Sequence, residues 1–185
     1  MGAVGPHLLD AVIRASHGFH VIKGWRWSRV NPVPGELVNC ATLNGSGTLM
    51  SLATALESGG MDEGLFIDLI DADWSFRLKE RGFELYGVSD SVFSHRMGDR
   101  TTRIWLLGWR TWPVRSPLRH RFLFRNGIIL LGRRYVPLVW KVWAIPKLIL
   151  TAIIFAVSGP DRSAQLKAML SGLIDGVMGR GGDIQ

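Results

Sequence analysis

Apolar and polar positions alternate most clearly between residues 71 and 81, where the pattern predicts a helix. Trp74 and Leu78 are four positions apart, and so are the opposite charges of Asp73 and Arg77, so each pair lies on one helix face. Carboxylates fill the first turn and basic residues fill the last, as the helix dipole favours. The segment is therefore expected to be a helix with acidic side chains at its N-terminus.

Beyond this helix the pattern changes to that of a strand. Gly82 suits the position that follows a helix C-terminus. Residues 83–88 are mostly apolar and predict a short strand. A polar turn then leads to Val92, Phe93 and His95, so the histidine is expected to return beside the acidic end of the helix.

The first 59 residues show shorter patterns. Residues 8–15 suggest a short helix in an otherwise irregular segment, and residues 37–43 form an apolar run typical of a strand. Asn44-Gly45-Ser46-Gly47 predicts a tight turn where backbone can approach a ligand closely, a plain hairpin being the alternative. Ser51 is a suitable N-cap for a helix through residue 56, which Gly59 would end.

The last third of the chain is first basic and tryptophan-rich, then apolar. Arg125-Asn126 opens a helix-like apolar run over residues 127–131, and residues 135–157 are mostly apolar. Two prolines and two lysines interrupt the second run, which leaves only residues 148–157 unbroken, whereas a bilayer span needs roughly 20 apolar residues. The pattern therefore favours a pair of helices in a membrane interface over a transmembrane helix. A buried core helix or an oligomer contact is the alternative.

Charge is distributed unevenly along the 185 residues, 47% of which are hydrophobic. Residues 1–99 carry 8 basic and 12 acidic side chains, whereas residues 100–160 carry 11 basic and no acidic ones. A basic, aromatic segment suits an anionic partner such as a membrane surface or a diphosphate. Nucleic acid is the weaker choice, because no nucleic-acid-binding module is recognisable. The single cysteine, Cys40, excludes an internal disulfide framework and a multi-cysteine metal site.

Three carboxylates fall within six residues, and they point to the candidate chemistry. Asp68, Asp71 and Asp73 are interleaved with aliphatic and aromatic side chains. Acids among such neighbours cost free energy to bury unless they are paired, hydrogen-bonded or bound to a ligand. The cluster therefore indicates a site more than a solvated surface. Capping of the helix N-terminus is the simpler alternative for Asp71 and Asp73.

Six short motifs follow one another between residues 3 and 140: the turn 44–47, the run 59–66 (GGMDEGLF), the box 71–77 (DADWSFR), the pair Gly82-Phe83, the segment 95–99 (HRMGD) and the pair Arg125-Asn126. In this order they resemble the catalytic domain of family 2 glycosyltransferases, most closely the bacterial rhamnosyltransferase-like branch. Each motif alone is weakly specific, but six in order are not expected by chance. The resemblance implies an α/β chain with a partial GT-A (nucleotide-diphospho-sugar transferase) fold and a helical C-terminal extension.

The resemblance also implies roles for individual residues. Asp71 matches the aspartate that acts as the catalytic base, which takes the proton of the acceptor hydroxyl as that oxygen attacks the anomeric carbon. His95 matches a histidine that joins the metal or contacts the diphosphate, with a structural histidine as the alternative. The other matched positions are expected to bind substrate or to hold the box in place: Gly45, Ser46, Gly47, Asp68, Asp73, Trp74, Arg77, Arg125 and Asn126.

The same resemblance identifies parts that the chain lacks. The family's nucleotide-binding strands and Asp-x-Asp metal motif precede the matched region, so the main ligands of the expected divalent cation (Mg²⁺ or Mn²⁺) are absent. Residues 1–125 are expected to be the acceptor-side half of a GT-A domain, and residues 126–185 a helical, membrane-associated extension. The chain is interpreted as a truncated product, a fragment or half of a split enzyme, with a missing N-terminal half on another chain and little activity alone.

The expected reaction is the inverting transfer of a sugar, L-rhamnose from dTDP-rhamnose, to a bacterial surface glycan. The partners would be the nucleotide-sugar donor, a glycan or lipid-linked glycan acceptor and a membrane surface, without nucleic acid. The expected location is cytoplasmic, peripheral on the inner face of the plasma membrane. The alternative comes from a different class: a non-catalytic membrane-surface or scaffold protein with a relict acidic site.

Overall fold

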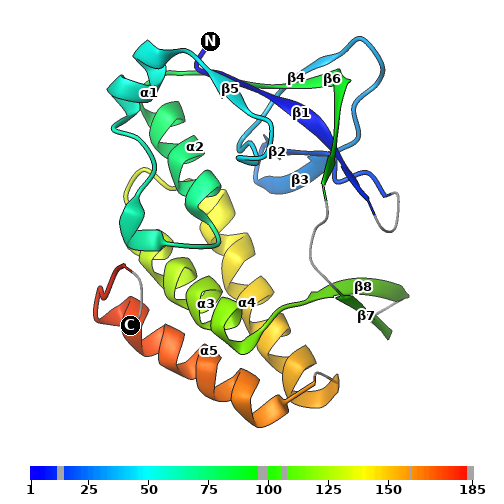
Figure 1. The fold of residues 1–185 in the computed structure, drawn as a ribbon, viewed down its shortest axis with the longest axis vertical. Coiled ribbons are helices and arrows are strands. Elements are labelled where there is room, and N and C mark those ends of the chain that lie inside the picture. The colour runs from blue at the N-terminus through cyan, green and yellow to red at the C-terminus, as the bar shows by residue number, and fades with distance from the viewer. Residues whose placement is uncertain (12–14, 96–99, 106–107, 159, 183–185) are drawn as a thin grey trace. The chain divides into compact units, whose positions relative to one another are not determined.

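The computed structural model describes residues 1–11, 15–95, 100–105, 108–158 and 160–182, which form a mixed α/β fold (Figure 1). Within these residues the backbone separates into two compact units. The first unit comprises residues 1–62, 70–96 and 134–140, and the second comprises residues 63–69, 97–133 and 141–185.

The first unit is built on a mixed sheet with the strand order β4-β6-β1-β5. Its central strands β1 and β6 run parallel, while β4 pairs antiparallel with β6 and β5 pairs antiparallel with β1. A separate antiparallel hairpin joins β2 to β3. The strands are β1 (Ala3–Asp10), β2 (Phe19–Lys23), β3 (Arg26–Val30), β4 (Leu37–Asn39), β5 (Leu49–Met50) and β6 (Leu85–His95).

Two helices of the first unit follow local signals in the sequence. The side chain of Ser51 accepts a hydrogen bond from the Thr54 N–H and caps α1 (Leu52–Ser58), and Gly59 ends this helix with φ = 73°. Helix α2 (Ile70–Glu80) carries acidic residues in its first turn and basic residues in its last. Both helices and the turn at 44–47 confirm the prediction. Because α2 places Trp74 and Leu78 in the core with strand residues, its N-terminal turn is fixed relative to the sheet.

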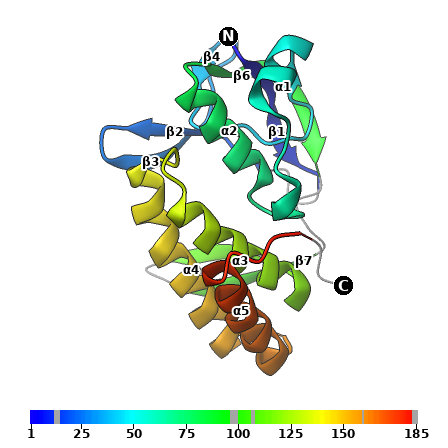
Figure 2. The same ribbon diagram turned by 90° about the vertical axis from the view of Figure 1, so that its left-hand side faces the viewer.

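The second unit combines a hairpin with three helices in the part of the chain that the structure describes. Helices α3, α4 and α5 lie side by side in both views (Figures 1 and 2), and a core that includes Phe124, Phe155 and Met169 joins them. The first turn of α4 belongs to the first unit and the remainder to the second. The elements are the 3₁₀ turn η1 (Glu63–Leu65), β7 (Arg100–Trp105), β8 (Trp109–Val114), α3 (Pro117–Gly132), α4 (Leu138–Ser158) and α5 (Arg162–Val177).

Helices α3 and α5 approach closely because two glycines of α5 face the backbone of α3. A Cβ atom on Gly172 would lie 2.2 Å from the carbonyl oxygen of Arg121, and one on Gly176 would lie 2.7 Å from that of Arg125. Polar pairs link the same helices: the Arg121 guanidinium binds the Asp175 carboxylate, with a shortest N–O distance of 2.8 Å. Helix α5 lies within the helical extension predicted for residues 126–185, although no local pattern gave its bounds.

Several predicted boundaries are wrong in the N-terminal half. A helix was expected at residues 8–15, but residues 8–10 form the end of strand β1. Residues 12–14 lie outside the described part of the structure. The expected strand at 37–43 is limited to β4. The expected polar turn after residue 88 belongs to β6, because the register moves from Pro6–Val88 directly to His7–Val92 and the polar residues form an irregularity within the strand.

The C-terminal helices also differ from the prediction. Arg125-Asn126 lies inside α3 rather than at the start of a helix, and the predicted boundary at residue 125 falls within the same helix. The expected helix pair is one continuous helix, α4, with Pro146 inside it. By length and composition α4 is able to cross a membrane: its most apolar window has a mean hydropathy of 1.8, and 28% of that window is buried.

Candidate active site

Asp71 lies in the first turn of α2 and binds the glycine-rich turn at residues 44–47. Its Oδ2 atom accepts a hydrogen bond from the Gly45 N–H at 2.9 Å. Asp71 is half-buried, so it is not enclosed in the core. The residue therefore combines a fixed orientation with access to a ligand, as a catalytic base requires.

The glycine-rich turn is itself fixed by its own contacts. The Ser46 N–H donates to Asn44 Oδ1 at 2.9 Å, and the Thr48 hydroxyl donates to the Asn44 carbonyl at 2.6 Å. Gly47 has φ = 74°, and a Cβ atom there would lie 2.8 Å from Pro6 Cγ. Glycine is therefore required at 47 by both backbone conformation and space.

A serine that the sequence analysis did not select provides a second link between the turn and α2. The Ser75 hydroxyl accepts a hydrogen bond from the Leu43 N–H at 3.1 Å and donates to the Asp71 carbonyl at 2.6 Å. Ser75 is fully buried, so its bond to the Leu43 N–H is shielded from water, while its bond to the Asp71 carbonyl is partly buried. The helix N-terminus and the turn are thus held together at two points.

Asp73 and Arg77 form a buried structural pair. The Asp73 side chain is 0% exposed, and its Oδ2 atom accepts from Arg77 Nε at 2.9 Å. The Tyr135 hydroxyl donates to Oδ1 of the same carboxylate at 2.5 Å. Arg77 also donates to the carbonyls of Ser58 and Gly60, each at 2.8 Å. These bonds join the C-terminus of α1 to α2 and agree with the expected role of holding the box in place.

Trp74 faces the core of the first unit. It is 1% exposed, and its indole N–H donates to the Ser58 hydroxyl at 3.3 Å. In this arrangement the ring supports α2 from inside. A direct substrate contact by Trp74, Asp73 or Arg77 stays a prediction.

The second unit contains an unusual loop at residues 63–69, which directly precedes α2 in the chain. Phe66, Asp68 and Leu69 have positive φ values of 57°, 63° and 64°. Side chains other than glycine rarely adopt this conformation, and it costs about 1–2 kcal/mol per residue. Such strain persists only where surrounding contacts enforce it.

The pair Arg125-Asn126 supplies those contacts. The side-chain amide of Asn126 donates to the carbonyls of Leu65, Ile67 and Asp68, each at 2.8 Å. Arg125 Nη2 donates to the carbonyls of Gly64 and Leu65, each at 3.0 Å, and its Nη1 donates to that of Gly182 at 2.6 Å. Arg125 and Asn126 are almost completely buried, so their side chains fix the loop from the protein interior and do not face an open surface.

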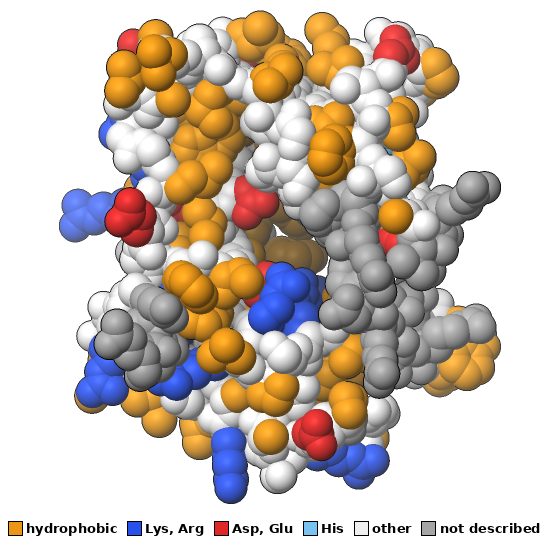
Figure 3. Space-filling view, viewed as in Figure 1, with side chains coloured by type: hydrophobic (Ala, Val, Ile, Leu, Met, Phe, Trp, Pro, Cys, Tyr) orange, Lys and Arg blue, Asp and Glu red, His pale blue; other side chains and the backbone are white. Residues whose placement is uncertain are grey.

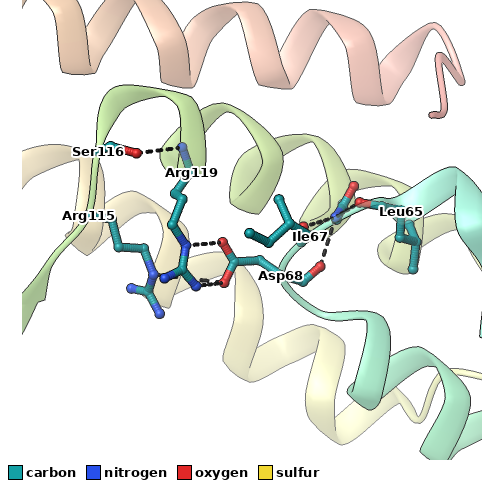
Figure 4. Close-up of polar contacts among 7 residues, drawn as sticks. Leu65, Ile67, Asp68, Arg115, Ser116 and Arg119 are labelled. Carbon is teal, nitrogen blue, oxygen red and sulfur yellow. Dashed lines mark hydrogen bonds and ion pairs between the residues drawn. The ribbon is translucent and has the colours of Figure 1, made fainter. Parts of the chain in front are cut away.

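Asp68 is held by two arginines near the N-terminus of α3 (Figure 4). Its carboxylate accepts from Arg119 Nη2 at 2.7 Å and from Arg119 Nε at 3.2 Å, and Arg115 Nε lies 3.9 Å away. The hydrogen bond to Asp68 raises the pKa of Arg119, whereas burial lowers the pKa of Arg115. No local pattern in the sequence pairs an aspartate with an arginine 51 positions away.

His95 ends β6, where its backbone pairs in register with Asp10 of β1. Its side chain lies outside the described part of the structure, so its expected role as a metal ligand stays a prediction. Among the described residues, no three His, Cys, Asp or Glu side chains gather closely enough to hold a metal ion. The described side chains alone do not provide a complete cation site.

The selected residues fall into two groups. Gly45, Asp71 and their neighbours meet in the first unit, and Asp68 meets Arg125-Asn126 in the second. The first group offers chemistry: a partly exposed carboxylate beside a backbone turn that a ligand can approach. The α/β architecture around it is compatible with a partial nucleotide-sugar transferase fold with a helical extension.

Comparison with known proteins supports this class. The chain is 30% identical over 135 residues to the dTDP-rhamnosyl transferase RfbF of Shigella flexneri, a match that covers 72% of this chain and 44% of the relative. The similarity supports a glycosyltransferase of a rhamnosyltransferase-like kind at the level of the family. The chain thus spans less than half the length of this curated relative. No protein-family model matches the sequence, and no solved structure matches it.

Proposed function

We propose that this chain is the acceptor-side part of an inverting family 2 glycosyltransferase of the GT-A type, with Asp71 as its catalytic base. The observation that carries the proposal is the Asp71 carboxylate. It is half-buried, it lies at the N-terminus of α2, and the Gly45 N–H holds its Oδ2 atom. The similarity to a dTDP-rhamnosyl transferase supports sugar transfer as the reaction in which such a base would act.

In the proposed reaction, Asp71 accepts the proton of an acceptor hydroxyl. The hydroxyl oxygen forms a bond to the anomeric carbon on one face of the sugar, while the bond from that carbon to the diphosphate oxygen breaks on the other face. The nucleoside diphosphate leaves with the bonding electrons, and the configuration at the anomeric carbon inverts. A positioned base of this kind accelerates such steps by about 10²–10⁴-fold.

The remaining site residues have supporting roles in the proposal. Backbone groups of Gly45, Ser46 and Gly47 face the substrate, because the glycines allow close approach. Asp73 and Arg77 keep α2 in position through their buried ion pair. Asp68 is a further substrate contact proposed from the family resemblance. Trp74, Arg125 and Asn126, which the resemblance also selects, are buried and act in the proposal by holding α2 and the loop at 63–69.

The proposed donor is dTDP-L-rhamnose, which the name of the relative supports. The proposed acceptor is a bacterial surface glycan or its lipid-linked precursor at the inner face of the plasma membrane, where the basic segment at 100–160 would meet anionic groups. A divalent cation, Mg²⁺ or Mn²⁺, would neutralise the leaving diphosphate. In the proposal its main ligands come from a donor-binding half outside this chain, and His95 is the ligand from this chain.

The donor can be tested by following incorporation of labelled sugar into membrane-extracted glycolipid. The chain is assayed alone and together with the donor-binding half of a related glycosyltransferase, with dTDP-L-rhamnose and UDP-glucose as competing donors. We expect transfer from dTDP-L-rhamnose by the combined proteins and little by this chain alone. Equal transfer from UDP-glucose would contradict the donor, and absence of transfer from every nucleotide sugar would contradict the function.

A further inference from the structure

Helix α4 has an outward face that is apolar along its whole length. The exposed residues of α4 up to Val157 are all apolar, and most recur every three or four positions, as one face of a helix requires. Seven of them are between 38% and 63% exposed: Leu138, Val142, Trp143, Ile145, Ile149, Ile153 and Val157. Pro146 is also exposed. An exposed apolar stripe of this size marks a surface that contacts a partner or a membrane.

The charged side chains of α4 do not interrupt this face. Lys141 Nζ donates to the Arg133 carbonyl at 2.7 Å, and Lys147 Nζ lies 3.5 Å from the centre of the Trp112 ring. Both lysines are therefore turned toward their own unit and are half-buried there. The two lysines that interrupt the apolar run in the sequence therefore lie beside the stripe, and the stripe is continuous.

The opposite side of α4 is already occupied. Ile154 and Phe155 belong to the core of the second unit, where Phe155 packs edge-to-face on His120 at 4.3 Å between ring centres. His120 Nδ1 is in turn hydrogen-bonded to Gln165 Oε1 of α5 at 2.6 Å, so a buried polar pair adjoins this core. A lipid-surrounded helix would have to leave these contacts. The structure instead favours a helix that keeps its inner face on the protein and offers its outer face to a surface.

Charge decides which surface fits. The 61-residue region from 100 to 160 that contains α4 has 11 basic and no acidic side chains. Arg119 and Arg121 are paired with carboxylates and Arg125 is buried, so the exposed basic residues that flank α4 matter most. Arg134, four positions before α4, and Arg162, four positions after it, are exposed. Most Lys and Arg side chains visible in Figure 3 lie over the helices of the second unit. A second copy of the chain would bring like charges together, whereas anionic lipid headgroups attract them.

We propose that the outer face of α4 docks on a membrane that contains anionic lipids, with the helix axis along the membrane surface. The aliphatic stripe lies below the headgroups, and the basic side chains at its ends contact their phosphates. This surface is independent of Asp71 and of the proposed reaction, so its failure and that of the reaction are distinguishable.

Vesicle flotation of the full chain tests the surface. We expect binding to phosphatidylethanolamine–phosphatidylglycerol vesicles and about tenfold weaker binding to phosphatidylcholine vesicles. The double variant Ile149→Glu/Ile153→Glu should lose binding by about tenfold or more. The control Leu52→Glu/Leu56→Glu alters two residues of α1 that are 74% and 72% exposed, and it should bind like the wild type. Equal binding by the wild type and the α4 variant would overturn the proposal.

A labelled cysteine provides a second readout that does not depend on charged substitutions. Cys40 is buried, and burial raises the pKa of its thiol to about 11, so a new surface cysteine reacts selectively. An environment-sensitive dye on Ile149→Cys should shift to the blue on anionic vesicles, and the same dye on Leu52→Cys should not. No shift at 149, or a wild-type dimer in light scattering that the α4 variant dissociates without any vesicle binding, would contradict membrane docking.

Discussion

The clamp on the loop at 63–69 leads to the most detailed prediction. Asn126→Ala removes an amide that donates to three carbonyl oxygens at 2.8 Å. An amide has two hydrogens, so the change removes about two full hydrogen bonds and leaves buried acceptors unsatisfied, at about 1–3 kcal/mol each. The loop also holds three positive φ values, each costing about 1–2 kcal/mol. Relaxation of this strain should limit the net loss to about 2–4 kcal/mol.

Two measurements check the Asn126 prediction. Urea unfolding gives the loss of stability, and hydrogen exchange reports on the loop through the Phe66 and Ile67 amides, which bond to the carbonyls of Glu63 and Leu65. Both amides should exchange faster in Asn126→Ala. Asn126→Asp removes the donors and places a carboxylate oxygen against the same carbonyls, so its loop amides should exchange at least as fast as in Asn126→Ala. The control Asn39→Ala changes an exposed asparagine and should alter stability by less than about 0.5 kcal/mol. Unchanged exchange in both Asn126 variants would refute the clamp.

Three further predictions concern packing and charge. Gly172→Ala should cost about 1–3 kcal/mol because its new methyl group meets the backbone of α3, whereas Gly132→Ala, with open space around it, should be neutral or stabilising in thermal unfolding. Burial and a neighbouring arginine lower the pKa of His20 to about 4. The unfolded state therefore binds more protons between about pH 6.5 and pH 4, and stability should fall by up to about 3 kcal/mol as the pH falls through this window. His20→Phe should remove that slope, and an unchanged slope would contradict the assignment. Tyr135→Phe should destabilise by about 1.5–3 kcal/mol because the buried Asp73 carboxylate loses a donor, and a loss below 0.5 kcal/mol in urea unfolding would contradict this.

Features specified within a few residues were predictable from the sequence. Ser51 and Gly59 define α1 through local capping, and the charges at the two ends of α2 define its direction. Asp71 was selected on its position and family resemblance, and the structure adds its bond to Gly45. These signals are local, because capping and the helix dipole act within one turn.

Features that depend on distant partners were not predictable in the same way. The end of β1 was mistaken for a helix because its partner, β6, lies more than 70 positions away. The motif pair Arg125-Asn126 was found, but its bonds to carbonyls about 60 positions away were not. The helical extension over residues 126–185 was predicted, but the bounds of α5 were not, because its glycines weaken a helical pattern and are explained only by the approach of α3. Pro146 suggested a break, yet α4 continues through it.

The most direct test of the central claim compares Asp71→Asn with Glu57→Gln in the sugar-transfer assay, with the donor-binding half of a related glycosyltransferase supplied. Asparagine keeps an oxygen that accepts the Gly45 N–H, so the fold and the turn should stay intact, whereas the base is lost. Glu57→Gln removes an exposed carboxylate of α1 and serves as the matched control. We predict that Asp71→Asn lowers the transfer rate by about 10²-fold or more and that Glu57→Gln does not. Transfer by Asp71→Asn at the wild-type rate would show that Asp71 only caps α2, and the proposed catalytic role would be wrong.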